Sequence, residues 1–272
     1  MELEFWGVRG TCPSSGKEFR KYGGHTPCAS LISRQGAMII VDAGTGIKNL
    51  GEKLLRRKRE GPLSISFFLT HFHLDHILGL PFFEPLYSSR ATLMFYAPAE
   101  PMVMEKYLSR LMAGRLFPIE FSQTQSKKIF KKISTKKIFI GGIRISYCPL
   151  FHPQGSVAYR FEEEGKAVVW ATDTEHPERG VDERLVALAR GASGLVYDAT
   201  FTPEEYDAGK RGWGHSTWLE GTKVARAAGV ERLFLSHFNP DHSDGRVDEA
   251  LRQARKNFPQ THAARPGLKI VF

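Results

Sequence analysis

The chain has 272 residues, of which 42% are hydrophobic, 25% charged and 11% aromatic, a composition that excludes disordered, collagen-like and disulfide-scaffold proteins. Its 38 basic and 29 acidic residues give a net charge of +9, which favours an anionic partner or substrate but does not decide the fold. The most apolar window, residues 64–83, holds three histidines and an aspartate, so no membrane span is expected.

The remaining composition points to one compartment and one domain. The opening sequence MELEFWGVRG lacks the basic and apolar regions of a signal peptide, so we expect a cytoplasmic protein. Cys12, Cys28 and Cys148 are too few for a disulfide framework and are expected to be buried free thiols. No stretch has the composition of a linker, and the length suits one domain that spans residues 1–272.

The predicted elements come as runs of strands separated by helices. Gly141 and Gly142 lie between two predicted strands and indicate a hairpin turn, and Ser216 is the predicted N-cap of the fourth helix. This order favours a mixed α/β or α+β protein with largely antiparallel pairing. We expect strands at residues 2–8, 28–33, 37–41, 64–70, 92–96, 137–140, 143–147, 156–161, 167–171, 194–198 and 232–237, and helices at 47–58, 101–113, 181–190, 216–228 and 247–257.

The segment from His71 to His76, with the pattern His-x-His-x-Asp-His, carries the clearest chemistry. It follows an apolar run and therefore lies where a buried strand ends. In extended backbone His71 and His73 point to the same side and can bind one metal ion, while Asp75 and His76 can reach a second ion as the chain turns. In a chain of this composition the motif arises by chance roughly 5 times in 10,000.

Further candidate ligands follow three later strands. His152 comes after the predicted strand at 143–147, Asp173 after the one at 167–171, and His237 closes the one at 232–237. A single polar residue at a strand end is usually part of a turn, but four such positions can converge on one edge of a sheet. The pattern predicts a dinuclear metal site.

This arrangement resembles the metallo-β-lactamase fold superfamily over nearly the whole chain. The resemblance implies a four-layer αββα sandwich. It also implies that His71, His73 and His152 bind one metal, that Asp75, His76 and His237 bind the other, and that Asp173 bridges them. Asp42, in Asp-x-Gly, is expected behind the metals as a hydrogen-bonding group. Zn²⁺ is expected from the imidazole and carboxylate ligands, with Mn²⁺ and Fe²⁺ as alternatives.

His215, in Gly-His-Ser-Thr, indicates the branch of the superfamily. With Asp198 upstream, it resembles the phosphodiesterase branch, which includes transfer-RNA 3′-processing nucleases. Two metals would share a hydroxide that attacks phosphorus, and His215, held in the right tautomer by Asp198, would protonate the leaving alkoxide. The predicted catalytic residues are His215, Asp198 and Asp75, and the predicted activity is a metal-dependent phosphodiesterase.

Two features favour a small substrate, most of all a cyclic nucleotide. Asp173 follows His152 by only 21 positions, which leaves no room for the long RNA-gripping arm that nuclease relatives insert there. Several phrases also resemble bacterial and phage cyclic-nucleotide phosphodiesterases, although His25, Gln154 and Phe238 depart from that subgroup. The phrases are FWGVRGT (5–11), YGGHTPC (22–28), LPFF (80–83), HPQG (152–155) and HFNPDHSD (237–244). Such relatives are commonly homodimers, so a homodimer is expected.

The alternatives remain open at this point. An RNA nuclease of the transfer-RNA 3′-processing type would explain the basic runs at 56–59 and 127–137, which otherwise suit solvated surface. An esterase or thioesterase would not need His215, and a binding module would not need the full ligand set. Phe82, Phe83 and Tyr87, with residues 102–116, are expected to cover the pocket, and Arg9, His25, Asp241 and His242 are candidate phosphate or partner-loop contacts.

Overall fold

A computed structural model describes residues 1–57, 61–134 and 137–272. In these residues the strands form two seven-stranded sheets. The first sheet contains β1 (Glu2–Gly7), β2 (Cys28–Ile32), β3 (Met38–Val41), β4 (Leu63–Phe68), β5 (Ala91–Ala97), β6 (Lys127–Lys132) and β14 (Lys269–Val271). The second contains β7 (Ile138–Ile140), β8 (Ile143–Leu150), β9 (Ser156–Glu163), β10 (Lys166–Ala171), β11 (Gly194–Asp198), β12 (Leu233–Ser236) and β13 (Thr261–Ala263).

The strand order brings several strand ends to one edge of the molecule. The first sheet runs β14-β1-β2-β3-β4-β5-β6, and the second runs β13-β12-β11-β10-β9-β8-β7. Strands β3 and β4 are parallel, as are β10, β11 and β12. Strand β8 is antiparallel to β9, which is antiparallel to β10, so β8 ends at the same edge as β10. The segments after all these strands can therefore meet.

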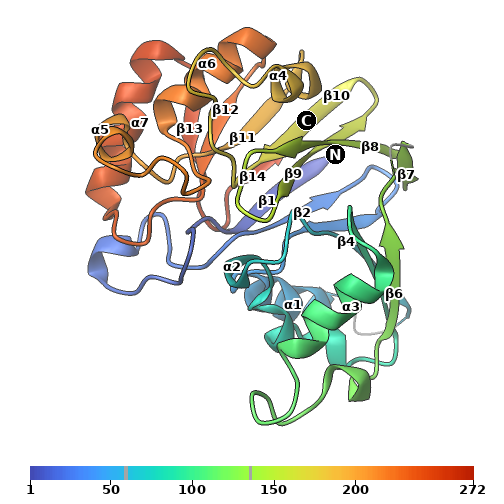
Figure 1. Cartoon of the computed structure of the whole chain (residues 1–272). Helices are drawn as coiled ribbons and strands as arrows, with labels where there is room; N and C mark the ends of the chain where they lie inside the picture. The colour runs from blue at the N-terminus through green and yellow to red at the C-terminus, as the bar shows by residue number, and fades with distance from the viewer. Residues whose placement is uncertain (58–60, 135–136) are drawn as a thin grey trace.

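Helices cover the outer faces of the two sheets (Figure 1). Helices α1 (Ile47–Arg57) and α3 (Pro101–Arg110) pack on the first sheet, while α4 (Glu183–Ala189), α6 (Trp218–Ala228) and α7 (Asp244–Asn257) pack on the second. The shorter helices are α2 (Leu74–Ile77), α5 (Pro203–Asp207), η1 (Lys17–Phe19), η2 (Leu80–Phe82), η3 (Glu84–Tyr87) and η4 (Phe121–Gln123). The layers are those of the expected αββα sandwich. Among the described residues, no helix has the length and apolar character needed to cross a membrane.

The alternation of side chains along β4 shows how the layers are held together. Phe67 points to the helical side, where it stacks on Phe95 at a centroid distance of 4.8 Å. Its neighbour Phe68 points to the second sheet and meets Tyr159 and Phe161 edge-on at 5.4 and 5.6 Å. Because both faces of the strand are buried, its sequence reads as a continuous apolar run. The metal-binding motif therefore starts from a rigid, two-sided core.

Most predicted elements are confirmed, with four kinds of difference. Strands β6, β13 and β14 were not predicted, nor were α2 and α5. The N-cap of α6 is Thr217 rather than Ser216, because the Thr217 hydroxyl accepts the bond from Glu220 N. Of the twelve strand pairings in the described residues, six are parallel, so the expectation of largely antiparallel pairing is wrong.

The lysine-rich run at 127–137 was not predicted as a strand, yet its first part forms β6 at the edge of the first sheet. Lysines suit an exposed edge strand because their charge prevents pairing with another chain. The other basic run, 56–59, includes residues 58 and 59, which lie outside the described residues, as do residues 135 and 136 of the first run.

Candidate metal centre

The candidate ligands lie at the shared edge described above. His71 and His73 follow β4, Asp75 and His76 lie in α2, and His152, Asp173 and His237 follow β8, β10 and β12. Each of these strands is buried, so the chain leaves the core with its direction fixed and the next side chains are held in place. The sequence-based prediction of one convergent edge is confirmed.

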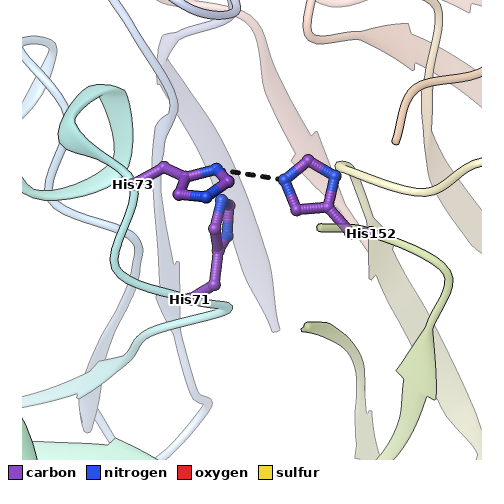
Figure 2. A group of neighbouring side chains, drawn as sticks. All are labelled: His71, His73 and His152. Carbon is purple, nitrogen blue, oxygen red and sulfur yellow. Dashed lines mark hydrogen bonds between the residues drawn. The ribbon is translucent and has the colours of Figure 1, made fainter. Parts of the chain in front are cut away.

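The first cluster consists of His71, His73 and His152 (Figure 2). One nitrogen from each ring lies within 4.8 Å of the others, and His152 Nε2 is 3.1 Å from His73 Nδ1. The three rings point toward one another (Figure 2). His71 and His73 follow β4 of the first sheet, and His152 follows β8 of the second. Three converging imidazoles are a ligand set that divalent transition metals favour.

The second cluster consists of Asp75, His76, Asp173 and His237, all buried. His76 Nε2 lies 3.2 Å from Asp173 Oδ2 and 3.4 Å from Asp75 Oδ2. His237 Nε2 lies 3.1 Å from Asp173 Oδ1 and 3.3 Å from Asp75 Oδ2. This mixture of two carboxylates and two imidazoles also suits a divalent cation.

Asp173 connects the two clusters. Its Oδ1 lies 3.9 Å from His71 Nε2 and 4.0 Å from His152 Nε2, so one carboxylate faces both ligand sets. His71 Nε2 is buried without a hydrogen-bond partner among the described residues. Buried polar atoms are normally satisfied, and a metal ion would satisfy this one. The residues present therefore fit a dinuclear centre, with Asp173 between the two sets of candidate ligands.

Each imidazole of the centre has its other nitrogen held by a neighbour. His76 Nδ1 donates to Asp42 Oδ2 at 2.8 Å, and His71 Nδ1 donates to the Thr70 hydroxyl at 3.0 Å. The remaining three bonds are His237 Nδ1 to Thr200 Oγ1 at 3.0 Å, His152 Nδ1 to the Gly214 carbonyl at 2.7 Å and His73 Nε2 to Gln154 Oε1 at 2.8 Å. Such bonds fix the tautomer that leaves the inner nitrogen free to bind metal. Asp42 thus has the supporting position that the resemblance implied.

Three residues of the centre have left-handed backbone conformations. Asp42, Asp173 and His237 have φ angles of 58°, 59° and 58°. Non-glycine residues seldom adopt this region, and when they do they cluster at functional sites. Asp42 and His237 directly follow β3 and β12, and Asp173 lies two residues after β10, so all three unusual φ angles occur where the chain leaves a strand.

The electrostatics show why the second cluster would bind a cation. Burial alone would lower the pKa of His76, but the carboxylates of Asp173, Asp75 and Asp42 hold it well above its usual value. Burial would also lower the pKa of His237, but the carboxylates of Asp173, Asp75 and Asp198 raise it to about 10. In contrast, burial and the neighbouring imidazoles keep the pKa of His71 well below its usual value, so this ring is neutral. The second cluster thus attracts positive charge strongly, whether as protons or as metal.

His215 and Asp198 form a pair beside the second cluster. His215 Nδ1 donates to Asp198 Oδ2 at 3.0 Å, and the ring stacks on His237 at a centroid distance of 4.9 Å. Asp198 Oδ2 also accepts the Asp173 backbone N–H at 2.9 Å. The expected contact between Asp198 and His215 is present, and buried Asp198 also links the predicted proton donor to the backbone of Asp173.

Two residues with clear supporting contacts were missed from the sequence. Glu175 accepts hydrogen bonds from Gly212 N at 2.7 Å, Gly214 N at 2.8 Å and the Tyr206 hydroxyl at 2.7 Å, and so holds the loop that leads into His215. A Cβ at Gly214, where φ is +79°, would overlap Pro153.

Gln154, noted from the sequence only as a departure from the cyclic-nucleotide subgroup, accepts a hydrogen bond from His73. The only sequence feature that could have indicated a role for Glu175 is its position two residues after Asp173.

Three residues that were expected near the substrate, Arg9, Phe83 and His242, have other contacts in the structure. Arg9 is fully buried and its guanidinium donates to the carbonyls of Gly23, Asn239 and His242, so it braces a loop. Phe83 is a core residue, which corrects its expected place in a lid. His242 contacts Glu205 at 2.9 Å.

Comparison with known proteins gives consistent results. Residues 38–238 match the family described as beta-lactamase superfamily domain. Ribonuclease Z from Metallosphaera sedula is 27% identical and the match covers 86% of this chain and 89% of that protein. Ribonuclease Z from Ignicoccus hospitalis is 28% identical over 90% of this chain and 92% of that protein. The crystal structure of the metallo-beta-lactamase fold protein YhfI from Bacillus subtilis superposes with a TM-score of 0.71 at 19% identity, covering 99% and 98% of the two chains.

Proposed function

Because the chain belongs to the beta-lactamase superfamily domain family of metal-dependent hydrolases, we propose that it cleaves a phosphodiester bond in RNA, as a nuclease of the Ribonuclease Z type. The observation that carries the proposal is the His215–Asp198 pair beside a complete seven-residue ligand set. A phosphodiester must expel an alkoxide, and a positioned imidazole can protonate it. Ester or thioester hydrolysis gives no comparable reason for this pair.

The chain's own residues divide the chemistry between them. When bound, two divalent metal ions would activate water and polarise the phosphoryl group. Asp198 orients His215 through Nδ1 at 3.0 Å, and no described residue hydrogen-bonds the His215 Nε2 atom, which stays available for the leaving oxygen. Asp42 and Thr200 hold two ligand rings in the tautomer that faces inward.

RNA is favoured over a cyclic nucleotide, which reverses the order expected from the sequence. Relatives that match most of the chain carry the name Ribonuclease Z, and the net charge of +9 suits a polyanion. These relatives are less than 30% identical, so their substrate supports the proposal without establishing it.

A small cyclic nucleotide is the second candidate, and one observation favours it. Strands β9 and β10 are joined by a turn of only Glu164 and Gly165, so no RNA-gripping arm can lie between the ligands His152 and Asp173. An RNA nuclease with this turn would have to bind its substrate through another surface.

The two candidates are separated by turnover of the metal-loaded protein. A 3′-extended transfer RNA would be offered beside 2′,3′- and 3′,5′-cyclic nucleotides, with Zn²⁺ and Mn²⁺ in parallel. We expect cleavage of the RNA. Asp173→Asn should abolish turnover, and the same change at exposed Asp207 serves as the matched control. Hydrolysis of a cyclic nucleotide with the RNA left intact would replace the first candidate by the second.

Three finer properties remain proposals. We propose Zn²⁺ as the resident metal, which elemental analysis of the purified protein would test. We propose a homodimer, in keeping with the exposed apolar side chains on α2, on α3 and in the loop after α3, which are Leu74, Met102, Tyr107 and Leu116. Sedimentation velocity would test this proposal. A cytoplasmic location stays a prediction from the sequence.

A further inference from the structure

A pocket of about 480 Å³ lies next to the candidate metal centre but contains none of its ligands. Its walls come from α5 and the segments on either side of it, from the segment between β12 and α7, and from the start of α7. The residues that matter are Phe201, Glu205, Lys210, Asn239, Asp241 and Arg246. The Phe201 ring meets the His215 ring at a centroid distance of 6.1 Å, so the pocket adjoins His215 through Phe201.

Lys210 is the cation of this pocket that no carboxylate neutralises. Its ammonium lies 3.8 Å from the centre of the Trp213 ring and 5.7 Å from that of Phe201, and it forms no ion pair within the described part of the chain. Arg246, the other cation, contacts Glu205 at 3.3 Å. The ring faces therefore hold the Lys210 ammonium in place while it remains able to contact an anion.

Trp213 gives the same region an exposed aromatic surface. The side chain is 55% exposed and meets Phe201 edge-on at 6.3 Å. Large exposed aromatic rings beside a lysine are the elements with which proteins bind single-stranded nucleic acid, because every base can stack on a ring and every phosphate can contact a cation. Asn239 also lines the pocket and adds a polar group.

Resting on the proposed function, we infer that this pocket binds the nucleotide that carries the leaving oxygen, with its base on Trp213 and its phosphate at Lys210. His215 must face the leaving oxygen to protonate it, so the leaving fragment lies on the His215 side of the centre. The pocket is on that side, through Phe201. It would also give an RNA substrate a binding surface that does not depend on an arm between β9 and β10.

The test compares a substrate that reaches the pocket with one that does not. Lys210→Ala and Trp213→Ala should each raise KM for a short RNA about tenfold while kcat changes less than threefold. Neither should alter KM for bis(p-nitrophenyl) phosphate, which is too small to extend from the centre into the pocket. Trp213→Phe should keep most of the RNA affinity. Lys166→Ala is the matched control, because it also removes a lysine but at the start of β10, away from the pocket.

Equilibrium binding gives a readout that needs no turnover. With metals removed by a chelator, fluorescence anisotropy of a labelled RNA should show about tenfold weaker binding to Lys210→Ala. The slope of log affinity against log salt should also fall by about 0.7, the value for one phosphate contact on a single strand. Lys166→Ala should match the unaltered protein in both quantities.

The outcomes separate this inference from the proposed function. If the unaltered protein hydrolyses bis(p-nitrophenyl) phosphate but no RNA, the proposed function fails and the inference fails with it. If RNA is cut and the Lys210 and Trp213 variants match Lys166→Ala in KM, affinity and salt slope, only the pocket assignment is overturned. Thermal melting of each variant excludes loss through unfolding, and Lys210→Gln repeats the test with more side chain retained.

Discussion

At the scale of single residues, the centre depends on what lies behind each imidazole. Five histidines direct one nitrogen inward because the other nitrogen donates to a carboxylate, a hydroxyl, a backbone carbonyl or an amide. Four of these partners are buried or belong to the backbone. Gln154, which holds His73, is an exposed side chain and is therefore the partner that can be changed with least effect on the fold.

Gln154→Gly should weaken the binding of one metal about tenfold, at the lower end of the effect typical of such supporting residues. Gln154 has a φ of 60°, a conformation that glycine adopts readily, so the metal-free protein should melt no earlier than the unaltered one. Competition titration with a chromophoric chelator would measure both affinities. Equal binding of both metals by the variant would show that the contact with His73 is dispensable.

The thiols should differ sharply in reactivity. Burial raises the pKa of Cys148 to about 12 and that of Cys28 well above its usual value, whereas Cys12 is exposed, contrary to the expectation of three buried thiols. Only the thiolate reacts, so below pH 12 most of Cys148 stays protonated. When the folded protein is treated with iodoacetamide at pH 8.5, Cys12 should be labelled first, and mass spectrometry would identify the labelled cysteine. Labelling of all three at one rate would contradict this.

The candidate ligands could be named from the sequence, and their convergence expected, because His-x-His-x-Asp-His is rare and because His152, Asp173 and His237 all follow apolar runs. Gln154 and Glu175 could not, since their roles depend on contacts across 81 and 39 residues. A single glutamine or glutamate in a loop carries no pattern that separates a supporting residue from a solvated one.

At the scale of elements, the segment from Gly212 to His215 lies outside the helices and strands, so its position depends on its contacts. It is held by Glu175, whose own backbone N–H donates to the Phe151 carbonyl at 2.6 Å. The same segment supplies the carbonyl that orients His152. One carboxylate therefore positions both a ligand and the proton donor.

Glu175→Gln should lower kcat by between 10- and 100-fold, because small displacements of positioned groups are costly to catalysis. The amide nitrogen of glutamine replaces one carboxylate oxygen and cannot accept an N–H, so either the bond from Gly214 or the bonds from Gly212 and Tyr206 would be lost. Tyr206→Phe, which removes only one of the three hydrogen bonds, should lose much less. Rates would be compared at equal metal content and with melting temperatures measured. Similar rates for the two variants would mean that Glu175 does not position His215.

Element prediction succeeded where periodicity and burial coincide and failed where they do not. Strand β4 is apolar and buried on both sides, and its prediction is confirmed. Strand β6 reads as a basic run because it lies at the edge of the sheet, and β13 and β14 have only three residues each. The short helix α2, which carries Asp75 and His76, has four residues and is too short to show a helical period.

At the scale of the whole molecule, the centre joins the two sheets. His71, His73, Asp75 and His76 follow β4 of the first sheet, whereas His152, Asp173 and His237 follow strands of the second. The chain ends also meet, because β14 pairs with β1. These links support the prediction that residues 1–272 form one domain, which a single cooperative unfolding transition would test.

Metal binding should stabilise the fold because it connects both sheets only in the native state. With free metal at about 1,000 times Kd the gain is about 4 kcal/mol, or on the order of 10 °C in Tm for a chain of this size. Calorimetry with and without a chelator would measure it, and Asp173→Asn should abolish most of the difference. An unchanged Tm after complete metal removal would show that the clusters do not bind metal as proposed.

The most direct test of the whole account is the dependence of His215→Ala on the leaving group, measured at equal metal content. If His215 protonates the leaving oxygen, cleavage of RNA, which expels an alkoxide, should fall about 10²- to 10⁴-fold. Hydrolysis of bis(p-nitrophenyl) phosphate should fall much less, because p-nitrophenolate leaves without a proton. Equal losses with both substrates, or no loss with RNA, would contradict the assignment of His215 and with it the proposed phosphodiesterase mechanism.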